Sequence, residues 1–252
     1  MKTHTFYTAG HSDALEYATQ IMQRKGCVFV QKPDSSVTDL ILPVPAFAPD
    51  GSLKGGGDIL QVLSRLPKDI TVYGGNLASI PQDYQTVDLL QDPFYLAENA
   101  DITAHCAIKL AMAKLPVTLK NCPVLVVGWG RIGNCLARLL WNLDAIVTVA
   151  ARKESDRAML TALGYDTEDT TFSGGYGLLR YRVIFNTVPQ MVLPKELTQY
   201  CHEDCLKIDL ASAPGIQGDD VIVARGLPSK DAPESSGELI ARTILYKKGA
   251  ST

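Results

Sequence analysis

The chain has 252 residues, of which 46% are hydrophobic and 20% are charged, and its formal net charge is −3 at pH 7. This composition is typical of a globular chain that buries a sizeable core in one large or two small domains, and it argues against disorder. The weak negative charge argues against broad binding to nucleic acid or to a membrane surface, because both need a basic face.

Strand and helix signals alternate in the amino-terminal part of the chain. Short apolar runs predict strands, and apolar positions at helical spacing between turn residues predict helices. The predicted strands are residues 5–8, 27–30, 39–43, 70–73 and 87–90, and the predicted helices are residues 13–24 and 59–66. A glycine-rich loop is expected at residues 51–57. This part is therefore predicted to be a compact α/β unit.

One long helix is predicted over residues 93–115. Pro93 suits its first turn, small and apolar residues follow at helical spacing, and Pro116 ends it. By analogy with other two-lobe proteins, we expect this helix to join two α/β units around a cleft.

The second unit begins with the most informative stretch of the sequence. A continuous apolar run that starts at Pro123 ends in a Gly-x-Gly-x-x-Gly turn, and a helical pattern follows through residues 135–143. A buried strand, a glycine turn and a helix, in this order, form a dinucleotide site. The turn consists of Gly128, Trp129, Gly130, Arg131, Ile132 and Gly133.

Each glycine of this turn has an expected role. Gly128 permits the tight turn, Gly130 leaves room for a pyrophosphate beside the backbone, and Gly133 lets the helix pack closely on the strand. The free N–H groups and the positive end of the helix then hold the phosphates of a nicotinamide coenzyme. Arg131 and Ile132 supply part of this helix start.

The alternation of strands and helices continues beyond the turn. The predicted strands are residues 146–150, 182–186, 206–210 and 221–224, and the predicted helices are residues 156–163 and 235–247. Alternating elements with one phosphate turn predict a parallel doubly wound sheet.

The end of the second strand of this unit bears on the choice of coenzyme. NAD sites usually place an acid there, but here the chain reads Ala150-Ala151-Arg152-Lys153-Glu154-Ser155. Arg152, with Lys153 and Ser155, can pair with a 2′-phosphate. These residues favour NADP over NAD; NAD stays open, and the alternative for the cluster is an ordinary solvated surface.

Asn186, Thr187, Val188 and Pro189 follow a predicted buried strand. The carboxyl end of such a strand faces the coenzyme crevice, so we expect these residues to line the nicotinamide side. Asn186 or Thr187 would bond the ribose and Pro189 would stiffen the turn. The alternative is a plain turn after a strand.

The catalytic residue is not identified by the sequence. Asp209, at the end of a predicted strand, and His105, in the long helix, are the candidates for acid–base work. Their alternatives are a structural aspartate that caps a loop and a histidine that packs at a domain junction. No metal is expected, because Cys201-His202-Glu203-Asp204-Cys205 lacks four convergent ligands.

The candidates for substrate binding all follow predicted strands or precede the last helix. Ser229 and Lys230 would bind an anionic substrate near the positive end of that helix. Small residues around Ser212 would let a ring approach the backbone, and Pro43 and Asn76 would form the other wall of the cleft. Each position is also compatible with simple turn chemistry.

Several short motifs follow one another along the chain: Leu42-Pro43-Val44-Pro45, the turn at residues 128–133, Asn186-Thr187-Val188-Pro189, residues 209–215, Gly226-Leu227-Pro228, and Ala232-Pro233 with Gly237. This ordered set resembles the family of the dipicolinate synthase A subunit. The resemblance implies two Rossmann-like lobes with the substrate between them. It also implies oxidation of dihydrodipicolinate to dipicolinate during spore formation (sporulation), with a pyridine nucleotide and a flavoprotein partner subunit.

The predicted fold class is α/β, with two Rossmann-like lobes built on parallel sheets. We expect a substrate lobe at residues 1–93, an inter-lobe helix at 94–118, an NAD(P)-binding domain at 119–231, and a helix at 232–252 that packs back at the lobe junction. No apolar run approaches the roughly 20 residues that span a bilayer, and no signal-peptide core is evident. With six scattered cysteines, this favours a cytoplasmic protein with reduced thiols.

The sequence hypothesis is therefore an NADP-linked oxidoreductase that acts on a small carboxylated heterocycle. Two alternatives stay open: a non-catalytic nucleotide-binding subunit of a flavoprotein complex, and another dehydrogenase that acts on an amino or hydroxy acid. A homo-oligomer also stays open.

Overall fold

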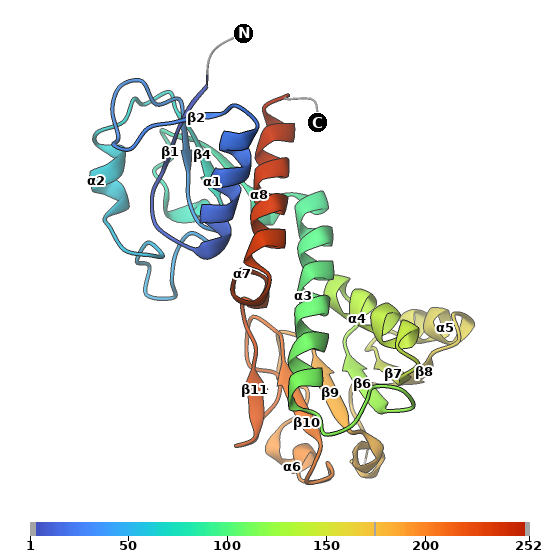
Figure 1. Cartoon of the computed structure of the whole chain (residues 1–252). Helices are drawn as coiled ribbons and strands as arrows, with labels where there is room; N and C mark the ends of the chain where they lie inside the picture. Colours follow the sequence, from blue (N-terminus) through green and yellow to red (C-terminus); the bar gives the residue numbers. More distant parts are fainter. Residues whose placement is uncertain (1–3, 174, 250–252) are drawn as a thin grey trace. The chain divides into compact units, whose positions relative to one another are not determined.

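The computed structural model describes residues 4–173 and 175–249. The chain divides into two compact units, which are described separately (Figure 1). Unit 1 comprises Met1–Asn99 together with Pro228–Thr252, and unit 2 comprises Ala100–Leu227. The last segment of the chain therefore belongs to the same unit as the first.

The sheet of unit 1 has five parallel strands in the order β2-β1-β3-β4-β5. The strands are β1 (Thr5–Thr8), β2 (Val28–Phe29), β3 (Asp39–Ile41), β4 (Thr71–Gly74) and β5 (Gln85–Asp88). The strand order reverses direction between β1 and β3. In doubly wound sheets, ligands bind at the carboxyl ends of the strands on either side of this switch point.

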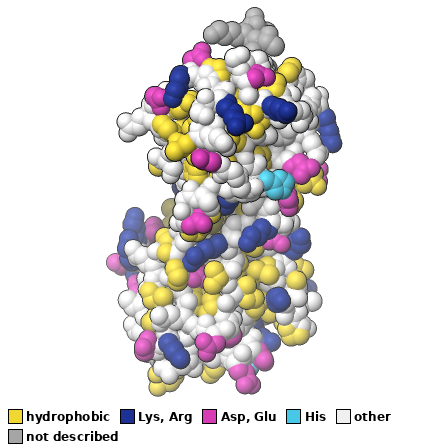
Figure 2. Space-filling view, turned by 90° about the vertical axis from the view of Figure 1, so that its left-hand side faces the viewer, with side chains coloured by type: hydrophobic (Ala, Val, Ile, Leu, Met, Phe, Trp, Pro, Cys, Tyr) yellow, Lys and Arg dark blue, Asp and Glu magenta, His cyan; other side chains and the backbone are white. Residues whose placement is uncertain are grey.

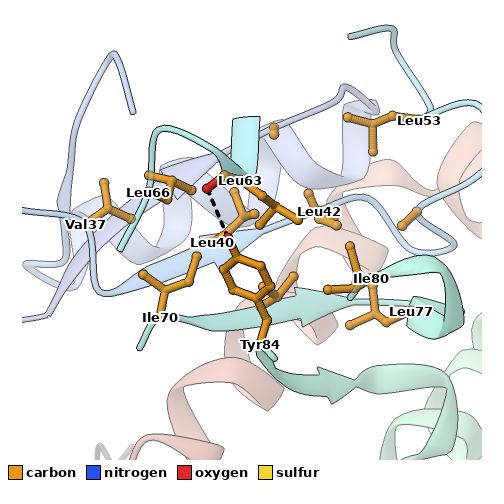
Figure 3. Close-up of a cluster of buried hydrophobic side chains, with 13 residues drawn as sticks. Val37, Leu40, Leu42, Leu53, Leu63, Leu66, Ile70, Leu77, Ile80 and Tyr84 are labelled. Atoms are coloured by element: carbon orange, nitrogen blue, oxygen red, sulfur yellow. Dashed lines mark hydrogen bonds between the residues drawn. The ribbon is translucent and has the colours of Figure 1, made fainter. Parts of the chain in front are cut away.

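Helices cover both faces of this sheet. Figure 1 shows α2 (Ile59–Leu63) on one side and α1 (Asp13–Arg24) with α8 (Pro233–Lys247) on the other. On the side of α2, Leu40 and Leu42 pack with Leu63 in a buried cluster (Figure 3). The Tyr84 hydroxyl donates a hydrogen bond to the Leu63 carbonyl at 3.0 Å, so its polar end is satisfied inside this apolar layer.

The contact between α1 and α8 depends on a glycine. A Cβ at Gly237 of α8 would lie 2.5 Å from Tyr17 Cβ, 2.7 Å from the Ala14 carbonyl oxygen and 2.8 Å from the Ala18 nitrogen. Real Cβ atoms do not approach other atoms so closely, and backbone atoms of a helix cannot move aside one at a time. Gly237 therefore sets the separation of the two helices.

We expect Gly237→Val to lower the free energy of unfolding by about 2 kcal/mol, because the added side chain forces the two helices apart. Urea denaturation followed by circular dichroism measures this change. Glu238→Ala, at the exposed neighbouring position, is the matched control and should change stability by no more than about 0.5 kcal/mol. An unchanged denaturation midpoint for Gly237→Val would contradict the packing described above.

The sheet of unit 2 has six parallel strands in the order β11-β10-β9-β6-β7-β8. The strands are β6 (Pro123–Val127), β7 (Ile146–Ala150), β8 (Asp166–Glu168), β9 (Val183–Asn186), β10 (Leu206–Asp209) and β11 (Val221–Val223). Counted from β6, this is the 3-2-1-4-5-6 order of dinucleotide-binding sheets, and its switch point lies between β6 and β9.

The helices of the rest of the chain are α3 (Pro93–Lys114), α4 (Arg131–Asn142), α5 (Glu154–Ala162), α6 (Lys195–Thr198) and α7 (Leu227–Asp231), with short 3₁₀ turns at Leu77–Ser79, Leu89–Gln91 and Tyr176–Arg180. Both faces of the middle of the unit 2 sheet are buried, because β6, β7 and β9 are mostly apolar along their length. Leu125 and Val127 of β6 belong to the buried cluster around Tyr181 and Ile184.

Some predicted elements differ from the observed ones. The predicted strand at residues 87–90 is wrong in its second half, because β5 ends at Asp88 and a 3₁₀ turn begins at Leu89. The Asp88 carboxylate accepts hydrogen bonds from the N–H groups of Leu77 (3.0 Å) and Leu90 (2.9 Å), and this capping ends the strand. The sequence patterns do not predict β8, α6 or α7.

Charged side chains of both signs are interspersed on the face drawn in Figure 2, in keeping with the small net charge. Among the helices that the structure describes, none has the length and apolarity that a membrane crossing requires. All six cysteines are free thiols.

Candidate functional site

The glycine turn of unit 2 lies at the switch point of the sheet. Gly128 follows β6 with φ at +104°, a conformation that side chains rarely adopt, and its N–H donates to the Ala150 carbonyl at 2.8 Å. A Cβ at Gly128 would lie 2.5 Å from the Thr187 Oγ1. The turn after β6 and the turn after β9 are therefore packed against each other.

Gly133 is needed for the contact between α4 and the turn. A Cβ at this position would lie 2.1 Å from the Gly128 carbonyl oxygen and 3.4 Å from Thr187 Oγ1. The role expected from the sequence, close packing of the helix, is the role that the geometry requires.

Gly130 differs from the other two glycines of the motif. A Cβ there would meet no protein atom within 4 Å, so nothing among the described residues requires glycine at this position. Gly130 is the N-cap of α4, no side chain caps the helix, and the first turn holds no acid. Open space beside uncapped N–H groups at a helix start fits a diphosphate.

Ser155 is exposed in the first turn of α5, and Arg152 and Lys153 are exposed in the loop between β7 and that helix. The backbone of this loop is held by Arg157, whose Nη1 donates to the carbonyls of Ala151 (2.7 Å) and Arg152 (2.9 Å) and to the Asp169 carboxylate (2.8 Å). The sequence prediction missed Arg157, since nothing in its local pattern marks a loop-bracing arginine. Arg152 thus extends from a fixed backbone while its own side chain is exposed.

The side chains of Asn186 and Thr187 are used inside the protein. The Asn186 Nδ2 donates to the Val188 carbonyl (3.0 Å) and to Asp209 Oδ1 (2.8 Å), and its Oδ1 accepts from the Val188 N–H (3.0 Å). The Thr187 hydroxyl donates to the Val127 carbonyl at 2.9 Å. The pair thus shapes the turn that carries Val188 and the exposed Pro189, and a bond from either side chain to a ribose stays a prediction.

Asp209 is the centre of a buried hydrogen-bond network. It is 1% exposed. Its Oδ1 accepts from Asn186 and from the Ala211 N–H (3.2 Å), and its Oδ2 accepts from the N–H groups of Gly215 (2.8 Å) and Ile216 (3.4 Å). A carboxylate with this many donors shapes a loop, which is the structural alternative that the sequence left open.

His105 and Ser212 lie on the surface of unit 2. His105 is exposed on α3, and its Nε2 lies 3.6 Å from the Asp101 carboxylate one helical turn earlier. Ser212 is exposed in the loop that Asp209 shapes. These positions give no support for a catalytic role of either side chain. Among the described residues, no group of three or more His, Cys, Asp or Glu side chains could hold a metal ion.

The remaining substrate candidates belong to unit 1. Pro43 is buried directly after β3, and Asn76 is exposed after β4 with φ at +58° and donates its N–H to Asp88 at 3.1 Å. Ser229 and Lys230 lie on the short helix α7, which the sequence patterns do not predict.

The two parallel doubly wound sheets, one in the dinucleotide-binding order, define the class of protein. The chain has the fold of two-unit, Rossmann-like dehydrogenases. A transhydrogenase from Sinorhizobium meliloti has this fold, with a TM-score of 0.71 at 12% identity, covering 98% of this chain and 95% of the transhydrogenase chain. No family model matches the chain.

The predicted resemblance to the A subunit of dipicolinate synthase is confirmed. The chain is 26% identical to that subunit from Bacillus subtilis (strain 168) in an alignment 239 residues long, which covers 86% of this chain and 80% of the relative. The crystal structure of the same subunit from Bacillus halodurans matches with a TM-score of 0.82 at 22% identity, covering 99% of this chain and 98% of the other.

Proposed function

We propose that this chain is an oxidoreductase like the A subunit of dipicolinate synthase and that it binds NADP through unit 2. The observation that carries the proposal is the empty space at Gly130 beside the uncapped start of α4, at the switch point of a sheet in the dinucleotide-binding order. Other glycines of the turn are explained by packing, whereas Gly130 is explained by a ligand that comes close to the backbone.

Residues of three loops would hold the coenzyme. The N–H groups of Arg131, Ile132 and Gly133 would receive the diphosphate, and the turn after β9 would line the nicotinamide side through its backbone and the half-buried Val188. When bound, the nicotinamide ring supplies the hydride chemistry. The chain's own work is to orient the ring and to shape the surface around it.

The proposal of NADP rather than NAD rests on the loop after β7. No acid stands at the end of β7: the strand ends at the buried Ala150, the buried Ala151 follows, and the exposed Arg152 and Lys153 come next. An acid at this point would repel a 2′-phosphate, and a guanidinium would bond it with two parallel N–H groups.

Arg152→Ala should weaken NADPH binding about tenfold, because one charge-assisted contact to the 2′-phosphate is lost, and should leave NADH binding unchanged. Titration of each reduced coenzyme by its fluorescence measures both dissociation constants. Lys120→Ala is the matched control, since Lys120 is an exposed cation that precedes β6, at the opposite edge of the sheet. Equal affinities for NADH and NADPH in the unaltered chain would contradict the choice of NADP.

The proposed substrate is dihydrodipicolinate, and the similarity to the dipicolinate synthase A subunit over most of both chains supports it. Oxidation to dipicolinate removes a hydride, which the oxidised coenzyme accepts, and a proton, which is released to solvent. The test is turnover by the purified chain, alone and with a flavoprotein subunit, followed by the absorbance of the reduced coenzyme. Coenzyme reduction with dihydrodipicolinate but not with alanine or lactate would support the proposal.

One observation favours a second candidate function. The side chains of Asn186 and Asp209 are engaged in structural hydrogen bonds, and His105 is an exposed surface residue. A nucleotide-binding subunit that becomes active only with its partner needs no acid–base group of its own. Coenzyme binding without turnover by the isolated chain, and turnover by the complex, would favour this candidate.

A further inference from the structure

Lys54 is held at the switch point of unit 1 by both loops that border it. Its backbone N–H donates to the carbonyl of Ala46, in the loop after β3, at 2.9 Å, and its carbonyl accepts from the N–H of His11, in the loop after β1, at 2.8 Å. These two loops follow the strands between which the strand order reverses. Lys54 therefore occupies the place where doubly wound sheets bind ligands.

Glycines make this placement tight. A Cβ at Gly10 would lie 2.6 Å from the Lys54 carbonyl oxygen, and a Cβ at Gly55 would lie 2.2 Å from the His11 nitrogen. Both glycines also have positive φ, at +77° and +81°. The segment around Lys54 is thus packed directly against the loop after β1, and its backbone has little freedom to move.

A second cation stands close to this lysine. Lys54 is half-buried, and burial lowers the pKa of its ammonium, with the positive charge of Lys230 lowering that pKa further. Within residues 4–173 and 175–249, no ion pair joins either lysine to an acid. Among the ion pairs of these residues, none therefore offsets the repulsion that Lys54 experiences from Lys230.

Two acids of the neighbouring segments, Asp58 and Asp13, have other partners. Asp58 accepts from the Leu60 N–H at 2.8 Å and caps α2, while Asp13, in the first turn of α1, lies 3.7 Å from the His11 ring. Neither neutralises the two lysines. A bound anion would relieve the repulsion, and it would be held by two charge-assisted contacts.

We propose that Lys54 and Lys230 together bind the carboxylates of a small dicarboxylate ligand, an inference that rests on the proposed function because it names how that substrate is held. A pyridine dicarboxylate carries two negative charges and matches the pair in sign and number. The backbone of Lys54 is held in place by the two loops, whereas the exposed side chain of Lys230 on α7 can adjust its position to the ligand.

Calorimetric titration of the full chain with dipicolinate, at constant ionic strength, tests this assignment. Lys54→Met and Lys230→Met should each weaken binding about tenfold or more, as loss of one charge-assisted contact implies. Lys25→Met is the matched control, because Lys25 is an exposed cation at the C-cap of α1, at the opposite edge of the same sheet. This variant should bind dipicolinate as tightly as the unaltered chain does. Lys230→Arg, which keeps the charge, should retain binding.

Two controls guard against misreading a loss of binding. Without ligand, Lys54→Met and Lys230→Met should melt no lower than the unaltered chain, because each removes a repulsion. With dipicolinate, the unaltered chain, Lys25→Met and Lys230→Arg should gain thermal stability, whereas Lys54→Met and Lys230→Met should not. Inorganic phosphate is the second probe. Phosphate binding as tight as that of dipicolinate would overturn the assignment to carboxylates.

The outcomes separate this inference from the proposed function. Coenzyme binding and turnover that persist with an unchanged KM in both methionine variants would overturn the lysine pair alone. Lysine-dependent binding of dipicolinate by a chain that binds neither NADPH nor NADH would support the pair and overturn the proposed oxidoreductase.

Discussion

Gly130→Val is expected to abolish coenzyme binding, with at least a roughly hundredfold rise in the dissociation constant for NADPH, while the fold stays intact. The backbone at Gly130 is extended, with φ at −85° and ψ at −169°, so valine adopts it without strain. The Cβ of the new side chain would meet no protein atom within 4 Å, and the side chain would fill the space beside the start of α4 where a diphosphate would lie. Loss of affinity without loss of stability is therefore the signature of a ligand site.

The two tryptophans provide the readout for this variant. Trp129 lies within the turn itself, and Trp141 is the exposed tryptophan of α4. In a Trp141→Phe background, energy transfer from Trp129 to bound NADPH reports binding at the turn. Gly133→Ala is the comparison variant, since its Cβ would collide with the Gly128 carbonyl oxygen at 2.1 Å and should lower stability. NADPH affinity in Gly130→Val within about threefold of the unaltered chain would contradict the proposed placement.

Asp209→Ala should lower the free energy of unfolding by about 4 kcal/mol. The substitution leaves the N–H groups of Ala211, Gly215 and Ile216 without their acceptor. Each buried donor that loses its partner costs about 1–3 kcal/mol, and loop relaxation recovers part of the sum.

Chemical denaturation of Asp209→Ala beside Ser212→Ala, an exposed residue of the same loop, measures this effect. The Ser212 variant should stay within about 0.5 kcal/mol of the unaltered chain. A variant of Asp209 that loses turnover but keeps its stability would instead point to a catalytic carboxylate and would contradict the structural role.

The features that sequence reasoning could predict are those with a local physical cause. The glycine turn is recognisable because strand, turn and helix occupy adjacent residues, and β6 and α4 begin and end close to where their apolar patterns place them. β8 escaped prediction because Asp166–Glu168 has no apolar alternation and forms a strand only by pairing with β7.

The site residues also divide into those whose role has a local cause and those whose role depends on residues far away in the sequence. The role of Gly133 depends on a turn five residues away and was predictable, whereas the bond from Asn186 to Asp209 depends on the pairing of β9 with β10. The proximity of Lys54 to Lys230 depends on the return of the chain to unit 1 at Pro228. Contacts between residues this far apart do not affect the residue pattern of either segment, so they cannot be predicted from it.

That return of α8 to α1 has a consequence for biosynthesis. Unit 2 is continuous in sequence and its strands are all made before α8, so it can fold while translation proceeds. Unit 1 lacks part of its helical layer until α8 has been made, so the face of α1 that packs on α8 stays uncovered until then. Nascent chains that stop before α8 should therefore expose this face of α1, and they are the species that chaperones would have to shield.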